Sequence, residues 1–192
     1  MRKVALAYAS CVFIVVAFVG ITYAVFTDKA SVLGASFSTG SAEMKLLADV
    51  SKGTEADNLV ESLPGPTFTG IGPNWTKDYP IKLYNNAGSP VLVTSKSKYL
   101  TTDDPKELRQ DISVELFSWE DTNGNGILDT CELGSSFGKK TIVKWNTEGL
   151  VLSELPAGDV QGFMLRFSTA TVSDTKQGAS ALFDFEFTSS GL

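Results

Sequence analysis

The chain has 192 residues, of which 22 are acidic and 16 are basic, so its formal net charge at pH 7 is −6. This acidic balance disfavours nucleic acids and anionic membrane surfaces as binding partners. The chain contains no histidine, which excludes Ser-His-Asp and Cys-His triads and almost every catalytic zinc site, so we do not expect an enzyme.

The N-terminal segment has the order of features that is typical of a secretory signal peptide. Basic residues begin it, a long apolar run follows, and the small residues Thr22 and Ala24 close it. We expect cleavage between Ala24 and Val25, so that residues 1–24 are a signal peptide and residues 25–192 are a secreted mature domain. The alternative is an uncleaved anchor, because the apolar run is long enough to span a bilayer if the residues around the cleavage site are included. We expect membrane contact only through this segment, before cleavage.

The mature chain shows a two-residue hydrophobic period, which indicates β-strands and not helices. The clearest run places Phe183, Phe185 and Phe187 on one face and Asp184 and Glu186 on the other. Turn-forming Asn, Gly and Pro residues separate the runs. The alternating runs lie at residues 81–84, 91–94, 112–116, 163–167 and 181–187. Many short strands with little helix predict an all-β fold, an antiparallel jelly-roll-like β-sandwich that follows the N-terminal signal helix.

Three segments depart from this alternation. Residues 141–145 are apolar on both faces, and we predict a further strand there. Thr102 is a suitable N-cap for a short helix over residues 103–110, which has a proline in its first turn. Residues 51–74 are rich in Gly, Pro, Ser and Thr, and we predict a long loop. No linker divides residues 25–192, so we expect one domain.

The segment 121–132 matches the twelve-residue calcium-loop pattern D-x-[DN]-x-[DN]-G-x5-E at every defined position. In such loops oxygen atoms surround the ion, a glycine permits a sharp turn, and the last carboxylate closes the site. The predicted calcium ligands are Asp121, Asn123, Asn125, the backbone carbonyl of Ile127, Asp129 and Glu132. Strand patterns flank the segment where an EF-hand would have helices, so we predict a calcium loop inserted between strands, with a stiffening and not a catalytic role. The alternative is an Asn- and Gly-rich turn that matches the pattern by chance.

Cysteine and tryptophan add two further observations. Cys131 is the one cysteine of the mature chain, so an intrachain disulfide is excluded there. Trp75, Trp119 and Trp145 allow two interpretations: they line a carbohydrate-binding surface, or they pack in the core and at its rim.

Several segments together resemble the TasA/camelysin family of bacterial surface and biofilm-matrix proteins, which a SipW-type signal peptidase releases. Phe26 and Asp28 match the aromatic-x-Asp start of the mature family members. Phe37 and Gly40 match the strand that follows, whereas Met44 stands where leucine is usual. Weaker similarity covers the Asn-rich turn that ends residues 75–88 and the terminal strand at residues 183–187.

The resemblance implies a jelly-roll sandwich, export, and assembly into extracellular fibres by donor-strand exchange, in which the segment freed by cleavage joins the sheet of the next subunit. The donor-strand residues that need burial are Val25, Phe26, Val32, Leu33 and Phe37. The alternative is that this segment folds back into its own sheet. The metalloprotease activity attributed to camelysin-type members is not expected, because no histidine is present to bind zinc.

We therefore expect an exported structural protein of the cell surface or biofilm matrix that self-associates into filaments. One alternative is a monomeric secreted module for calcium-dependent adhesion or carbohydrate binding. A hydrolase that uses carboxylates alone is a third interpretation.

Overall fold

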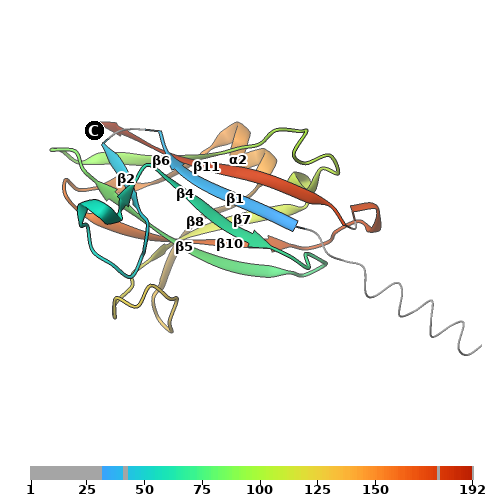
Figure 1. Cartoon of the computed structure of the whole chain (residues 1–192), viewed down its shortest axis with the longest axis horizontal. Helices are drawn as coiled ribbons and strands as arrows, with labels where there is room; N and C mark the ends of the chain where they lie inside the picture. Colours follow the sequence, from blue (N-terminus) through green and yellow to red (C-terminus); the bar gives the residue numbers. More distant parts are fainter. Residues whose placement is uncertain (1–31, 41–42, 177, 192) are drawn as a thin grey trace, which may run out of the picture.

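The structure is a computed structural model that describes residues 32–40, 43–176 and 178–191. Within these residues the strands form two sheets that pack face to face, as Figure 1 shows. The predicted all-β sandwich is confirmed. The signal peptide, its cleavage site at Ala24 and Val25, and the donor-strand residue Phe26 lie outside the described residues.

The first sheet, called sheet A, has five strands and carries the N-terminal strand in its interior. In spatial order its strands are β4 (Ser62–Phe68), β1 (Val32–Thr39), β11 (Ser180–Gly191), β6 (Val91–Lys98) and β9 (Leu150–Leu155). β1 runs parallel to β11 and antiparallel to β4. This parallel pair is an exception to the predicted antiparallel arrangement. Parallel neighbours need a long crossover connection, and here the rest of the domain between the first and last strands provides it.

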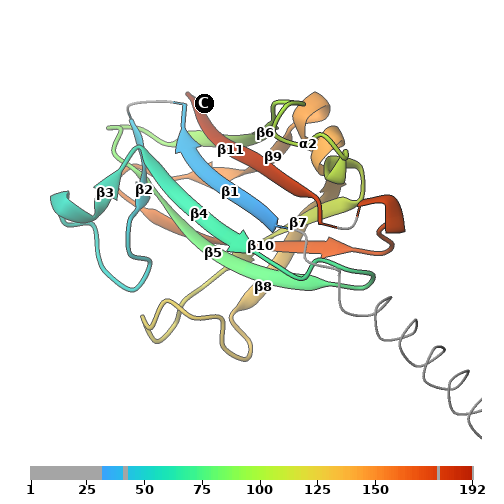
Figure 2. The ribbon, with the colours of Figure 1, turned by 45° about the vertical axis from the view of Figure 1, so that its right-hand side comes forward.

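The second sheet, called sheet B, has six antiparallel strands. In spatial order these are β3 (Leu59–Val60), β2 (Met44–Leu47), β5 (Thr76–Asn85), β10 (Val160–Thr169), β7 (Ile112–Trp119) and β8 (Leu133–Thr141). Figure 2 shows how β5, β7, β8 and β10 lie behind sheet A. The connection from β7 to β8 contains the predicted calcium loop.

The hydrophobic core lies between the two sheets and is built by the alternation that the sequence displays. Phe183, Phe185 and Phe187 of β11 are fully buried, and so are Phe163 and Phe167 of β10. The rings of β10 and β11 meet across the sandwich, with the centroids of Phe167 and Phe185 5.7 Å apart in an edge-on arrangement. Such contacts add to the stabilisation that burial of each ring already provides.

The prediction of a strand at residues 141–145 is wrong, because this segment begins helix α2 (Ile142–Glu148). The Thr141 side chain caps the helix by accepting a hydrogen bond from the Lys144 amide. Ile142 and Trp145 are three residues apart and therefore share one face of the helix, which is fully buried. Apolar residues on one helical face thus gave the appearance of a strand that is apolar on both sides.

The predicted helix over residues 103–110 is also wrong, apart from a single 3-10 turn at Leu108–Gln110. The buried Asp104 carboxylate accepts hydrogen bonds from the amides of Leu108 and Arg109 and from the Arg109 guanidinium. Glu107 has a φ of 57°, which lies in the left-handed region and interrupts a right-handed helix. The carboxylate, and not the Thr102 hydroxyl, organises this turn.

The predicted loop over residues 51–74 contains two strands, β3 and β4. β4 includes Pro64 and Pro66 and lies at the edge of sheet A, where a strand tolerates residues that lack an amide hydrogen. The proline-rich composition therefore marks an edge strand and not a loop.

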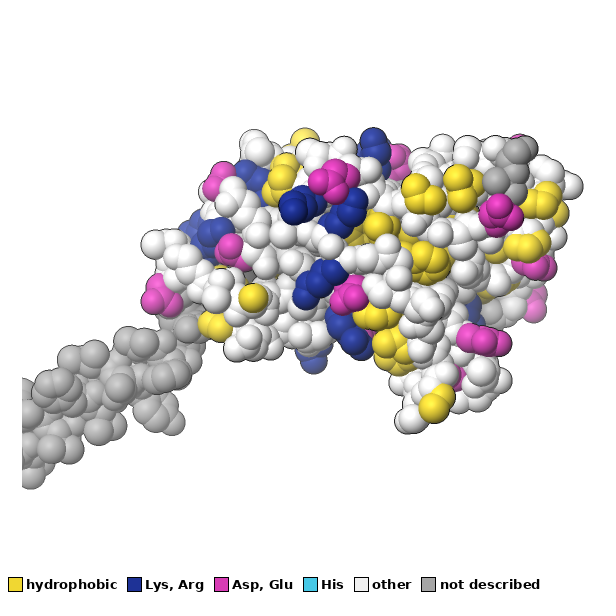
Figure 3. Space-filling view, turned by 180° about the vertical axis from the view of Figure 1, so that it is seen from behind, with side chains coloured by type: hydrophobic (Ala, Val, Ile, Leu, Met, Phe, Trp, Pro, Cys, Tyr) yellow, Lys and Arg dark blue, Asp and Glu magenta, His cyan; other side chains and the backbone are white. Residues whose placement is uncertain are grey.

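The described residues contain no helix with the length and apolarity that a membrane crossing requires. On the face seen in Figure 3, basic and acidic side chains are mixed and do not form one large basic patch.

Candidate functional site

The candidate site is the connection between β7 and β8, which projects from the body of the domain (Figures 2 and 3). It lies against the turn that follows β2. A Cβ atom added to Gly126 would lie 3.1 Å from atoms of both Val50 and Ser51. Gly126 also has a φ of 74°, so both the space and the backbone conformation favour glycine here.

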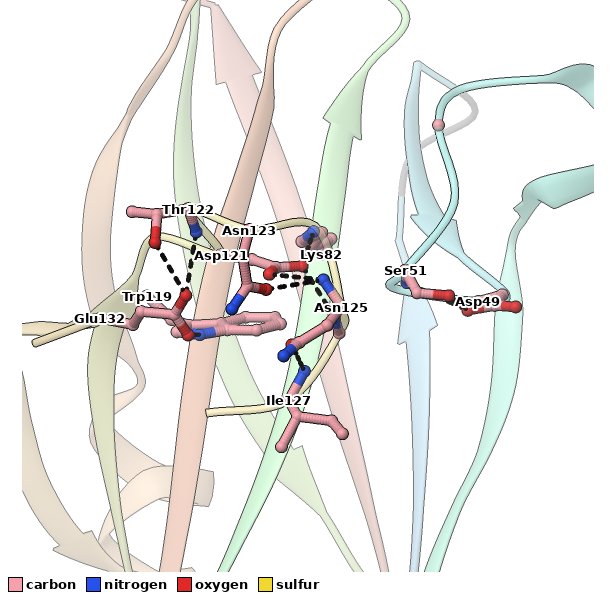
Figure 4. Close-up of polar contacts among 12 residues, drawn as sticks. Asp49, Ser51, Lys82, Trp119, Asp121, Thr122, Asn123, Asn125, Ile127 and Glu132 are labelled. Carbon is pink, nitrogen blue, oxygen red and sulfur yellow. Dashed lines mark hydrogen bonds and ion pairs between the residues drawn. The ribbon is translucent and has the colours of Figure 1, made fainter. Parts of the chain in front are cut away.

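The carboxylate of Asp121 organises the first half of the loop. Its Oδ1 accepts a hydrogen bond from the Asn125 amide at 3.1 Å, and its Oδ2 accepts one from the Gly126 amide at 3.0 Å. The Asn123 side chain accepts from the Asn125 amide, and the Asn125 side chain accepts from the Ile127 amide. Figure 4 shows how these side chains turn into the loop. The spacing of two residues suits such turns, because Asp and Asn side chains accept from amides two residues further along.

Asp129 joins this group from the second half of the loop. Its Oδ2 accepts hydrogen bonds from the side-chain amides of Asn123 and Asn125, at 2.7 and 2.8 Å. Four of the six predicted calcium ligands therefore lie together: Asp121, Asn123, Asn125 and Asp129. Rotating the side-chain amide of Asn123 or Asn125 by 180° would exchange the positions of its nitrogen and its oxygen. The oxygen would then point toward Asp129.

Glu132, the predicted closing ligand, is held at the base of the loop. Its Oε1 accepts from the amide and the hydroxyl of Thr122, and its Oε2 accepts from the Asp129 amide and the Trp119 indole. The predicted ligand at Ile127 is its backbone carbonyl, and this residue is exposed on the loop. In this arrangement Glu132 closes the loop by hydrogen bonds to the chain itself.

Lys82 of β5 provides the positive charge at the site. Its ammonium lies 2.8 Å from Asp121 Oδ2, and the two side chains are 14% and 1% exposed. The same ammonium lies 5.1 Å from the centre of the Trp119 ring. Lys82 reaches this position across Gly162 of β10, which pairs with Lys82 on one side and with Trp119 on the other. A Cβ atom on Gly162 would lie 2.5 Å from the Trp119 carbonyl oxygen, so the position between Lys82 and Trp119 requires glycine.

The two buried carboxyls of the loop have lowered pKa values. Burial alone would raise the pKa of Asp121, but the hydrogen bonds from Lys82 and from the Gly126 amide outweigh burial and lower it. The Asp129 amide lowers the pKa of the Glu132 carboxyl, against the effect of burial, with further hydrogen bonds from Thr122 and Trp119. Both groups are therefore ionised at neutral pH.

The donor set suits a hard cation in kind, because it consists of carboxylate and amide oxygens without sulfur or imidazole. Asp121, Asn123, Asn125 and Asp129 would hold calcium, and Glu132 would complete the set only after it leaves Thr122 and Trp119. Among the residues that the structure describes, no group of three or more His, Cys, Asp or Glu side chains is arranged to hold a metal ion. The loop thus contains oxygen atoms of the kind that calcium binds. In this structure those oxygen atoms accept hydrogen bonds from other groups of the chain.

The other predicted site residues belong to the N-terminal strand. Leu33 and Phe37 are fully buried in β1, within the sheet of their own chain, which is the alternative arrangement considered for this segment. Val32 begins the same strand. Of the tryptophans, Trp145 is fully buried and Trp119 is 3% exposed, so these two do not form an exposed aromatic platform.

Sequence reasoning did not identify Lys82, Gly162 or Thr122 as parts of the site. Lys82 alternates with the buried Ile81 and Leu83, and that pattern indicates only that it lies on the outer face of its strand. Its meeting with Asp121 depends on the pairing of β5, β10 and β7, for which the sequence contains no signal.

Comparison of the chain with models of known protein families gives no match, and comparison with curated proteins gives none either.

Proposed function

We propose that this protein is an exported structural component of the cell surface or biofilm matrix, which assembles into fibres by exchange of its N-terminal strand. The observation that carries the proposal is the position of β1. It is the first described strand, yet it lies in the interior of sheet A between β4 and β11. Only residues 40–43 connect it to β2 in the opposite sheet.

The side chains of β1 support exchange, because a single strand of eight residues contributes them to the core. Leu33, Ala35 and Phe37 point inward, and the Phe37 ring stacks on Tyr79 with centroids 5.2 Å apart. A second copy of β1 would make the same contacts and the same main-chain hydrogen bonds to β4 and β11. Exchange through a chain end is head-to-tail and does not close, so it produces filaments and not closed oligomers.

Export in this proposal depends on residues 1–24 acting as a signal peptide, with a SipW-type signal peptidase as the processing partner. The mature chain then starts at Val25 outside the cell. The same proposal assigns no catalytic role, since the chain lacks histidine.

The loop at residues 121–132 is proposed to bind calcium weakly, in the range of about 10⁻⁴–10⁻³ M that extracellular modules use. The convergence of Asp121, Asn123, Asn125 and Asp129 supports this part of the proposal. A bound cation would rigidify the connection between β7 and β8 and its contact with the turn near Ser51.

A monomeric secreted module for calcium-dependent adhesion is the second candidate. The observation that favours it is that β1 is already paired in its own sheet, so the isolated chain has a complete sandwich. The buried Trp119 and Trp145 argue against carbohydrate binding on an aromatic surface.

Disulfide trapping distinguishes the two candidates. Ser36 of β1 and Asp184 of β11 are paired in register, and the Ser36 hydroxyl donates to the Asp184 carboxylate. Neighbouring strands lie about 4.8 Å apart, within the range that a disulfide spans. Ser36→Cys with Asp184→Cys, in a Cys131→Ser background of residues 25–192, reports whether β1 belongs to the same chain.

Strand exchange predicts filaments by negative-stain microscopy and a ladder of disulfide-linked multimers on a denaturing gel. The matched control is Thr94→Cys with Thr188→Cys, which joins β6 to β11 and should give monomers in either case. Filaments whose β1 disulfides are all intrachain would show that another surface drives assembly. Dispersed monomers with intrachain disulfides would exclude the fibre proposal and favour the adhesion module.

A further inference from the structure

The Lys82 ammonium contacts Asp121, the first residue of the calcium pattern, at 2.8 Å. The ammonium and the Gly126 amide both donate to Oδ2 of Asp121, while the Asn125 amide donates to Oδ1. Asp121 is the first residue of the calcium pattern, so its carboxylate would be a ligand. The charge of this buried carboxylate is already neutralised from within the chain.

Lys82 also makes a second favourable contact, with the Trp119 ring. The Trp119 ring lies under its ammonium at a centroid distance of 5.1 Å, which is a favourable cation–π contact. Gly162 keeps the path between β5 and β7 free of side chains. The lysine can therefore release Asp121 and keep its position over the aromatic face.

The other predicted ligands form their hydrogen bonds with groups other than Lys82. Asn123, Asn125 and Asp129 bond to one another, and Glu132 bonds to Thr122 and Trp119. Among the residues that the structure describes, Lys82 is the cation that forms an ion pair with this loop. A positive charge within contact distance of Asp121 also repels any cation that the same carboxylate would bind.

We propose that Lys82 and a metal ion compete for Asp121, so that Lys82 both keeps the loop folded without metal and sets its calcium affinity. This inference rests on the calcium-binding part of the proposed function. The loop then has two closed states. At low calcium Lys82 pairs with Asp121, and at high calcium the metal ion replaces Lys82 at Asp121.

The test compares wild type with Lys82→Met, which keeps an unbranched side chain over Trp119 but removes the charge. Calcium affinity is measured by titration calorimetry on residues 25–192. Hydrogen exchange of the Asn125 and Gly126 amides, recorded in a chelator, measures how well the loop stays closed without metal. Lys82→Arg, which keeps the charge, tests whether the charge is what matters.

Lys45→Met is the matched control, because Lys45 also lies on sheet B, is 19% exposed and pairs with Glu61 at 2.6 Å. It should change neither calcium affinity nor the exchange of the loop amides. This variant separates an effect of Lys82 on the loop from the general loss of one lysine.

Competition predicts that Lys82→Met binds calcium roughly ten- to a hundred-fold more tightly than wild type, as expected for the loss of a hydrogen bond between charged groups. The loop amides should exchange faster in the chelator, and Lys82→Arg should resemble wild type. Binding by Lys82→Met alone would be the extreme form of the same result. Equal or weaker affinity in Lys82→Met would overturn the inference and leave the calcium loop in place. No calcium heat from either protein would overturn the calcium proposal and this inference with it.

Discussion

Replacing Phe37 by alanine tests whether β1 is held in the core as the structure describes. The ring is fully buried and stacks on Tyr79 at 5.2 Å and on Phe185 at 5.8 Å. Its edge also lies over Gly65, where an added Cβ atom would be 2.6 Å from the ring. The glycine has no side chain to fill the space that the substitution would leave.

The expected cost follows from these contacts. Replacing a buried phenylalanine by alanine costs about 3–5 kcal/mol of folding free energy. Phe37 has two aromatic neighbours and would leave a cavity that cannot collapse, so we expect Phe37→Ala to cost about 4 kcal/mol. With a urea dependence of about 2 kcal/mol per molar, the unfolding midpoint should fall by about 2 M.

Urea unfolding of residues 25–192, followed by far-ultraviolet circular dichroism in a chelator, measures this shift. Leu182→Ala is the control, because Leu182 lies on the adjacent strand β11 but is 47% exposed. That change should cost less than about 1 kcal/mol. A loss below about 2 kcal/mol for Phe37→Ala, with an unchanged urea dependence, would refute the reasoning, since the ring would then lie outside the core of its own chain.

The remaining predictions concern the supports of the loop and a buried ion pair. Gly162→Ala should lower the free energy of unfolding by about 1–3 kcal/mol in thermal unfolding, because its Cβ would lie 2.5 Å from the Trp119 carbonyl oxygen. Asp104→Ala should lower it by about 3 kcal/mol in urea, because the Arg109 guanidinium would lose the carboxylate that is buried with it and keep only the carboxylate of Glu107, which is 52% exposed. The pKa of Asp121 is lower in the folded than in the unfolded chain. Its contribution to stability is therefore fully present above the unfolded pKa of about 3.9 and is lost as pH falls through the folded pKa, which urea unfolding at a series of acidic pH values measures.

Each of these predictions has its own control. Gly88→Ala should unfold like wild type, because its Cβ would meet no atom within 4 Å. Adding Arg109→Met to Asp104→Ala should recover part of the lost stability, since it removes a charge that has lost its buried partner. Asp121→Asn should lose the acid-dependent component that wild type shows, and an unchanged pH profile in this variant would contradict the assignment to Asp121.

The sequence predicted the strands with regular alternation correctly. In β11, apolar side chains occupy every second position from 181 to 187, and these side chains are buried as expected. β5, β6, β7 and β10 were found for the same reason. Local alternation is sufficient where one face of a strand meets the core and the other meets solvent.

Prediction failed where long-range contacts override local patterns. The apolar residues at 142–145 form a helix because the Thr141 cap and a buried position over β6 favour it, and no periodicity in so short a segment distinguishes the two structures. β4 was missed because its prolines resemble those of a loop, although an edge strand accepts them. The helix expected after Thr102 gives way to a turn that the buried Asp104 carboxylate organises.

The candidate site likewise combines contacts that local spacing predicts with contacts that it does not predict. The spacing within residues 121–129 by itself determined that Asp121, Asn123, Asn125 and Asp129 meet, because these contacts join residues a few positions apart. Only the tertiary structure decided that β1 lies beside β11 and that Lys82 meets Asp121, since these pairs are far apart in the sequence. The physical reason is that local spacing fixes local hydrogen bonds, whereas the partners of a strand are chosen by burial across the whole chain.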